Sequence, residues 1–155
     1  METKNLGDQF HIKGVHTFTI RDAESGDVLR SETIENIIVT AGRSVLARLL
    51  AGNATYTGEI TYGALGSGTT AVANTQTQLV AEVTRVPTTS ATFADNIAYI
   101  SFFFPSGSLV NYEEFANFID GTGTANSGQM FTRVLMSGSK AATETLTIDS
   151  TYTIT

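Results

Sequence analysis

The sequence predicts an all-β fold with a single short α-helix near residues 40–51. Three observations support this prediction: short segments alternate between apolar and polar residues, glycine-rich turns separate them, and one stretch has helical periodicity. Short strands at this spacing favour a β-sandwich or a barrel. Of these two architectures, we expect a β-sandwich of jelly-roll type.

The chain of 155 residues has the length of one domain, which we place at residues 10–155. Residues 1–9 mix charges with glycine and have no clear period, so we expect a flexible N-terminal arm. They also lack the apolar core of a signal peptide, which predicts synthesis in the cytoplasm. No apolar run approaches the roughly 20 residues that span a bilayer, so no membrane partner is expected.

Charge and cysteine content exclude several classes of function. The chain has 9 Lys and Arg against 15 Asp and Glu, with no basic run, so nucleic acid is not an expected partner. It has no Cys, which excludes disulfides, thiolate nucleophiles and Cys-rich zinc sites. Only 15% of the residues are charged, so an extended surface is easier to bury against a neighbouring protein.

The first two strands are predicted over residues 10–22 and 28–39. In the first strand His16, Phe18 and Ile20 share one face, and polar residues take most of the other. Between the strands, residues 24–27 (ESGD) form a turn, which completes a hairpin.

The helix is predicted to begin with Thr40 as the N-cap and to end at Gly52. An apolar stripe at helical spacing should face the core. Its members are Val45, Leu46, Leu49 and Leu50.

The second half of the chain predicts strands only. They are expected at residues 60–65, 79–86 (ending at Pro87), 91–104, 109–118, 129–137 and 144–154. Both faces of the segment 91–104 are apolar, which predicts one central strand.

The loop Gly66-Ser67-Gly68-Thr69-Thr70 resembles a phosphate-binding loop in its glycines alone. It has no Lys to reach a phosphate, and no helix follows it at once. We therefore interpret it as a flexible turn and expect no cofactor.

Catalytic and metal sites are not predicted either. His11 and His16 lie on or beside the first strand, where a satisfied, partly buried His16 is expected rather than a catalytic base. Neighbours such as Glu113 and Glu114 point to opposite faces of a strand and so cannot flank one bond. A calcium site at Asp120 and Asp149 matches no known loop pattern.

Glu82 and Arg85 are the candidate ion pair. Residues three apart face each other on a helical turn but lie on opposite faces of a flat strand. Their pairing therefore requires a locally turn-like backbone, and we expect a structural role for it.

An ordered set of segments resembles small virion structural proteins of tailed bacteriophages. These segments are residues 36–43 (NIIVTAGR), 60–70 (ITYGALGSGTT), 79–85 (LVAEVTR), 113–118 (EEFANF), 130–134 (MFTRV) and 145–148 (TLTI) with Lys140. Two of them contain A-L-G-x-G and L-x-x-E-x-x-R patterns that are similar to those of the family. Residues 115–117 (FAN) depart from the family pattern, which has a small residue after the first acidic position.

The resemblance implies a non-enzymatic structural protein of the particle, made in the host cytoplasm and located in the virion. We expect a capsid decoration, or cement, protein that binds the outer surface of the major capsid protein, with a homotrimer favoured. A tail-fibre or baseplate component is the alternative. A carbohydrate-binding β-sandwich is the second alternative, with Tyr56, Tyr62 and Tyr112 as exposed stacking platforms.

Two segments are candidates for the interface, the N-terminal arm and the loop of residues 67–78. The arm has no core pattern of its own, and the small polar residues of the loop could follow another surface closely. The residues we single out are Asp8, Gln9, Phe10, Ser67, Thr69, Thr70, Asn74 and Gln76.

Overall fold

The computed structural model describes residues 10–155, which form strands and one short helix. Asp8, Gln9 and the rest of the predicted arm lie outside the described residues. In chain order the elements are β1 (Ile12–Asp22), β2 (Val28–Ile38), α1 (Thr40–Leu50), β3 (Ile60–Gly66), β4 (Glu82–Ala94), β5 (Ile97–Phe104), β6 (Val110–Ile119), β7 (Gln129–Lys140) and β8 (Glu144–Ile154).

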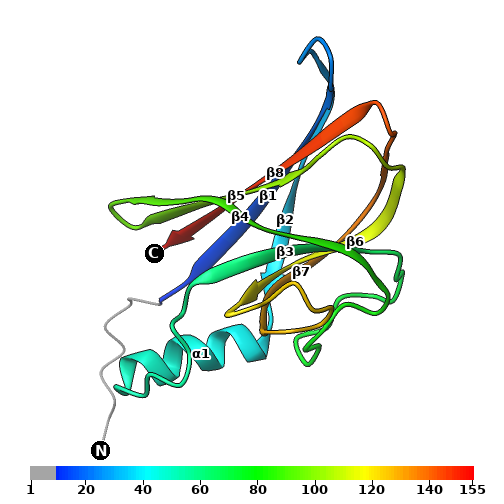
Figure 1. The fold of residues 1–155 in the computed structure, drawn as a ribbon. Coiled ribbons are helices and arrows are strands. Elements are labelled where there is room, and N and C mark those ends of the chain that lie inside the picture. Colours follow the sequence, from blue (N-terminus) through cyan, green and yellow to red (C-terminus); the bar gives the residue numbers. More distant parts are fainter. Residues whose placement is uncertain (1–9) are drawn as a thin grey trace, which may run out of the picture.

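The strands of residues 10–155 close into an antiparallel barrel with the order β1-β2-β7-β6-β3-β4-β5-β8 (Figure 1). Two strands change partners along their length. β2 pairs with β1 and then, at Ile37 and Ile38, with β7. β4 pairs with β3 up to Pro87 and with β5 from Thr88 onward. Both strands therefore bend from one half of the barrel to the other.

The all-β class and the short helix near residues 40–51 are confirmed by this architecture. The jelly-roll sandwich is not confirmed, because the hydrogen-bonded strand order runs continuously around a closed barrel. Closure leaves no strand at the end of a sheet, so unpaired strand edges are confined to stretches where neighbouring strands separate, as β2 and β7 do beyond Ile37 and Ile38.

The main core fills the barrel with aromatic and aliphatic side chains from facing strands. Phe115 meets the ring of Phe18 at 5.6 Å and that of Phe102 at 5.8 Å, both in edge-to-face geometry. The alternation predicted for β1 is confirmed, since His16, Phe18 and Ile20 are all buried. Burial of one large apolar side chain contributes about 1.5–3 kcal/mol, so these rings account for much of the stability.

The prediction of one central strand at residues 91–104 is wrong. The chain turns at Asp95 and Asn96, and β4 and β5 form a hairpin. Asp95 has a φ of 51°, a left-handed conformation that Asp and Asn adopt more readily than most residues. Only one face of β5 is buried: Phe102 is inside the barrel, whereas Phe103 is 42% exposed.

Helix α1 packs against β7 by one face only. Val45 is buried, but Leu49 and Leu50 are exposed, so the predicted four-residue core stripe is only partly correct. The N-cap is Val39 rather than Thr40, and it makes no side-chain cap. In residues 10–155 no helix is long and apolar enough to cross a membrane.

Gly42 sets the distance between α1 and β7. A Cβ atom at this position would lie 2.8 Å from both the Cα and the carbonyl oxygen of Phe131. Because these are backbone atoms of a paired strand, they cannot move away cheaply.

We expect Gly42→Ala to lower the free energy of unfolding by about 1–3 kcal/mol, as overpacked cores do, although alanine is the better helix former. Urea unfolding followed by circular dichroism measures this change. Ser44→Ala, at an exposed position of the same helix, should be neutral or slightly stabilising. If Gly42→Ala were as stable as Ser44→Ala, the close contact would have no energetic importance.

Candidate interaction surface

A second apolar cluster lies on the opposite face of the strands from the barrel core. It consists of Val39, Ala64, Leu79, Ala116, Phe118 and Met130. Leu79 belongs to the long loop between β3 and β4, residues 67–81, and is 1% exposed. This loop and the loop of residues 120–128 are each attached to this face by a buried acid–arginine pair.

The first pair is Glu114 and Arg133, and both side chains are fully buried. A register shift between Tyr112 and Glu114 reverses the alternation of β6, so Tyr112 contacts the barrel core and Glu114 lies under the loop. The carboxylate of Glu114 accepts hydrogen bonds from the backbone N–H groups of Gly68 (3.1 Å) and Ala81 (2.9 Å).

Arg133 completes this attachment. Its Nε donates to Glu114 at 2.8 Å, and its two terminal nitrogens donate to the carbonyl oxygen of Thr70 at 3.0 Å. Nη1 also donates to the side-chain oxygen of Gln76 at 3.0 Å. The pair therefore binds the loop near both of its ends and in the middle. The predicted flexible loop is thus attached to the barrel by specific hydrogen bonds.

The pairing of Glu114 with Arg133 was not predicted, although the sequence contains a signal for it. Arg133 is the single charge in the apolar run MFTRVLM, and Glu114 is the charge that borders the apolar run FANFI in the preceding strand. A charge buried in such a segment must be paired, because the cost of leaving it unpaired is several kcal/mol. Two opposite charges in consecutive strands were therefore candidates for a pair.

The second pair is Glu82 and Arg85, whose side chains are 3% and 5% exposed. Nε and Nη2 of Arg85 donate to the two carboxylate oxygens at 2.5 Å and 2.8 Å. The required irregular backbone is present, since the register of β3 with β4 shifts between Leu65 and Gly66. Arg85 also donates to the Thr122 carbonyl at 2.9 Å, which fixes the loop of residues 120–128.

The structure brings two of the predicted interface residues together. Phe10 and Asn74 line one groove, and Asn74 also accepts a hydrogen bond from the backbone N–H of Thr40 at the start of α1. Ser67, Thr69 and Thr70 are exposed on the attached loop, whereas Gln76 is half-buried and binds Arg133. Nothing in the described residues tests Asp8 and Gln9.

The groove runs between α1 and the adjoining parts of β1 and β2, with a volume of about 530 Å³. Its most exposed apolar side chains are Phe10 (71%) and Leu50 (89%). The other lining residues are His11, Ile12, Asn36, Ile37, Ile38, Arg43, Leu46, Ala47 and Asn74. Large apolar side chains in a concave surface are typical of sites that bind another protein or a ligand.

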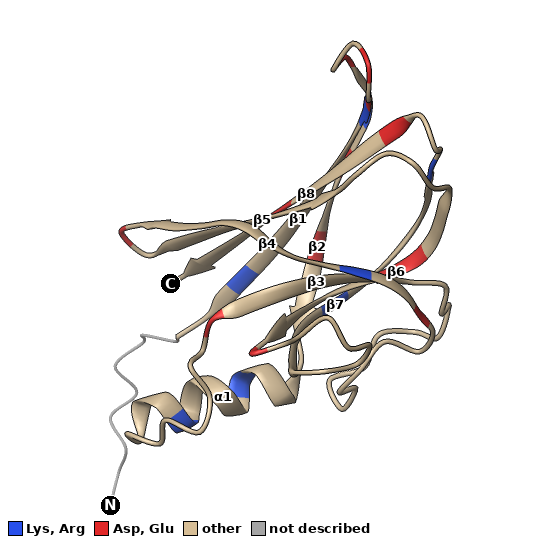
Figure 2. Cartoon of the chain, in the orientation of Figure 1, with Lys and Arg blue, Asp and Glu red and all other residues tan. Residues whose placement is uncertain are grey.

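Positive charges are spread thinly over the molecule. Figure 2 shows Lys and Arg on β1, α1, β4 and β7, separated by long stretches of ribbon without a basic residue. Arg43 is the basic residue that lines the groove. The groove is therefore mainly an apolar surface with one positive charge on its wall.

A buried polar network surrounds His16 inside the barrel. His16 is 0% exposed, with Nδ1 2.8 Å from Ser150 Oγ and Nε2 beside Asn36 Nδ2. Burial lowers the pKa of His16 to about 3, because a charged imidazolium would lose its hydration. Thr132 and Tyr152 complete the network. His16 is buried completely rather than partly, and it is a weak base without access to a substrate.

The candidate calcium ligands lie in different parts of the barrel. Asp149 is in β8 and accepts a hydrogen bond from Ser101 at 2.5 Å, whereas Asp120 follows β6 and accepts one from the Thr57 backbone at 2.8 Å. Among residues 10–155 there is no group of three or more His, Cys, Asp or Glu side chains that could hold a metal ion.

The three tyrosines do not form exposed stacking platforms, so that prediction is wrong. Tyr112 is 3% exposed and stacks on Phe18. Tyr56 and Tyr62 are half-buried, and each has an arginine guanidinium over its ring, 5.8 Å and 5.7 Å from the centroid. None of the three side chains is therefore in the exposed class.

The fold and the surface define a class: a small closed antiparallel β-barrel whose long loops are attached beside an apolar groove. Comparisons with protein-family models, with curated proteins and with solved structures found no match to this chain.

Proposed function

We propose that this protein is a non-enzymatic structural protein of a tailed phage particle. In this proposal it acts as a capsid decoration, or cement, protein that binds the outer surface of the capsid and stabilises the shell. The observation that supports it best is the groove of about 530 Å³, with Phe10 and Leu50 exposed on its walls. The assignment to a phage particle rests on the sequence resemblance described above.

The attached loops suit a protein that must match another surface. The Glu114–Arg133 pair holds residues 67–81 in one conformation, so little conformational entropy is lost when they are covered. Asn74 belongs both to this loop and to the groove, which makes the two a continuous surface. The low charged share of the chain further reduces the desolvation cost of an interface.

Stabilisation of the shell follows from mass action. A protein that binds the assembled capsid and not its free subunits shifts the equilibrium toward the assembled state. Many copies, each burying a modest area, add their contributions. A homotrimer is the favoured arrangement, since one trimer can contact several capsid subunits at once.

We also propose that the barrel is a closed variant of the jelly-roll sandwich, since β2 and β4 divide it into two facing halves.

We expect Leu50→Glu to reduce occupancy on the particle at least about tenfold, which corresponds to about 1.4 kcal/mol of binding free energy. Leu50 is 89% exposed, so the isolated variant should unfold at the same urea concentration as the natural protein. Leu109→Glu is the control, because Leu109 is 63% exposed and outside the groove. Quantitative mass spectrometry of purified particles measures occupancy; equal occupancy of the two variants would remove the groove from the proposal.

The position of the protein distinguishes the capsid role from the tail-fibre or baseplate role. Gold-labelled antibody should bind over the whole head if the protein decorates the capsid, and only at the tail if it is a fibre or baseplate component. Particles stripped of the protein should also lose resistance to heat. A protein absent from purified particles would refute both roles.

A further inference from the structure

The barrel has a partly open seam between β2 and β7. These strands are paired only at Ile37 and Ile38, although β1 pairs with β2 along almost its entire length. At the other end of the seam, Arg30 of β2 donates to the Ser139 carbonyl at 2.6 Å and to Glu144 at 2.8 Å. Between these two closures lie residues 31–36 of β2, which span roughly 20 Å in extended conformation.

Along this span β2 has β1 on one side and no strand on the other among residues 10–155. Backbone N–H and C=O groups of an antiparallel strand point alternately to its two sides. Half of those in residues 31–36 therefore face the seam without a strand partner. Such an edge is a template for one added strand, because only an extended backbone places its donors and acceptors at the same spacing.

A pocket of about 110 Å³ opens from the seam into the barrel. Its lining residues Phe18, Ile20, Tyr112 and Met136 are at most 7% exposed and belong to the main core. An apolar cavity of about 150 Å³ can hold a benzene molecule, so the volume of this pocket suits a single side chain. Alternate side chains of an added strand point toward the barrel, so one of them would reach the pocket.

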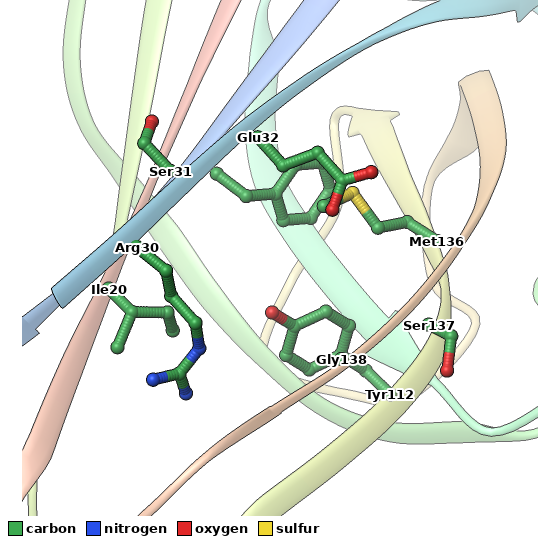
Figure 3. Close-up of a pocket in the computed structure, with 9 residues that line it drawn as sticks. Ile20, Arg30, Ser31, Glu32, Tyr112, Met136, Ser137 and Gly138 are labelled. Carbon is green, nitrogen blue, oxygen red and sulfur yellow. The ribbon is translucent and has the colours of Figure 1, made fainter.

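Charge at the rim specifies the side chain. Figure 3 shows Arg30 and Glu32 leaving β2 on the side of Tyr112 and Met136. Arg30 is already paired with Glu144, whereas Glu32 forms no ion pair with any described residue. A lysine side chain fits both parts of the site, since its methylene stem can lie on the apolar lining while its ammonium group meets Glu32.

We propose that the β2–β7 seam binds an extended segment of another protein by strand addition to β2, with a lysine side chain in the Phe18–Tyr112–Met136 pocket. The chain has a net charge of −6, so a basic partner segment is favoured over a second copy of this protein. This inference is independent of the virion role, because the pocket beside the seam shares no lining residue with the groove beside α1.

The test uses two nine-residue peptides that alternate threonine with valine and carry either lysine or glutamate at the centre, on the valine face. Isotope-edited NMR titration of the full chain gives their dissociation constants, and amide hydrogen exchange shows where they bind. We expect exchange protection in residues 31–36, and at least about tenfold tighter binding of the lysine peptide. Protection elsewhere, or no protection at all, would overturn the proposal.

Two charge reversals make the test specific. Glu32→Lys should reverse the preference between the peptides, whereas Glu35→Lys should preserve it, because Glu35 is an exposed residue that pairs with Lys13 outside the pocket. An unchanged preference in Glu32→Lys would refute the lysine pocket. Light scattering tests the alternative role, in which Arg30 and Glu32 only prevent the edge of β2 from pairing with another copy of the protein. A natural chain that binds neither peptide, combined with a Glu32→Gln variant that self-associates, would show that edge protection is the role of these charges.

Discussion

Replacing Arg133 with methionine is expected to lower the free energy of unfolding by about 3–5 kcal/mol. The side chains of Glu114 and Arg133 are both 0% exposed. The substitution therefore leaves the Glu114 carboxylate buried without the arginine that it pairs with. It also removes the arginine donors to the Thr70 carbonyl and to the Gln76 side-chain oxygen, which then keeps only the Ala73 N–H. Urea unfolding at neutral pH measures the loss.

A local measurement connects this loss to the loop. Arg133→Met should accelerate amide hydrogen exchange more in residues 67–81 than in β1 or β8, because the loop is attached chiefly through Glu114 and Arg133. Adding Glu114→Gln to Arg133→Met removes the unpaired charge and should recover about 1–3 kcal/mol, a coupling usual for contacting residues.

The exposed pair of Lys13 and Glu35 is the matched control. These side chains are 63% and 69% exposed, so Lys13→Met should change the free energy of unfolding by less than about 1 kcal/mol. A loss of that small size in Arg133→Met would show that the buried pair does not hold the loop in place.

Local patterns in the sequence predicted the elements that depend on near neighbours. The alternation of His16, Phe18 and Ile20 identified β1, and the last strand has the bounds that were expected, Glu144–Ile154. The hairpin at Asp95 was missed because the segment after it, residues 97–104, is apolar on both faces, and this apolar run concealed the turn signal of Asp and Asn.

Closure of the barrel was beyond reach because it depends on which distant strands pair. Both changes of partner, in β2 and in β4, follow from register set between segments far apart in the chain. The predicted strand end at Pro87 is wrong for this reason, because β4 continues to Ala94 with a second partner. Pro87 lies within β4, next to a register shift at Thr88 and Ser90, where a missing N–H is tolerated and the strand turns to its second partner.

Only part of the candidate surface could be predicted from the sequence. The spacing of Glu82 and Arg85 was visible in the sequence, but only the register shift opposite Gly66 places them on one face. Phe10 and Asn74 were chosen separately, from an arm and a loop, and their meeting in one groove depends on the position of α1. Short-range spacing predicts pairs, whereas grooves need the whole topology.

Acid should destabilise the protein through His16 before most carboxylates begin to titrate. The pKa of His16 is lowered from 6.5 to about 3, so between these values the unfolded chain binds a proton that the folded chain excludes. The contribution to stability is complete above pH 6.5 and falls as the pH decreases toward 3, because protonation favours the unfolded state there. From pH 6.5 to pH 5 the expected loss is about 2 kcal/mol.

The matched variants are His16→Gln and His11→Gln. His16→Gln removes the buried imidazole, so the free energy of unfolding should become nearly independent of pH between 6.5 and 5, whatever its absolute value. His11→Gln should keep the slope of the natural protein, because it leaves the buried imidazole of His16 in place. NMR supplies a direct readout: the ring protons of His16 should not shift between pH 7 and pH 5. A His16 resonance that titrates near pH 6.5 would show that water reaches the network inside the barrel, and would contradict its burial.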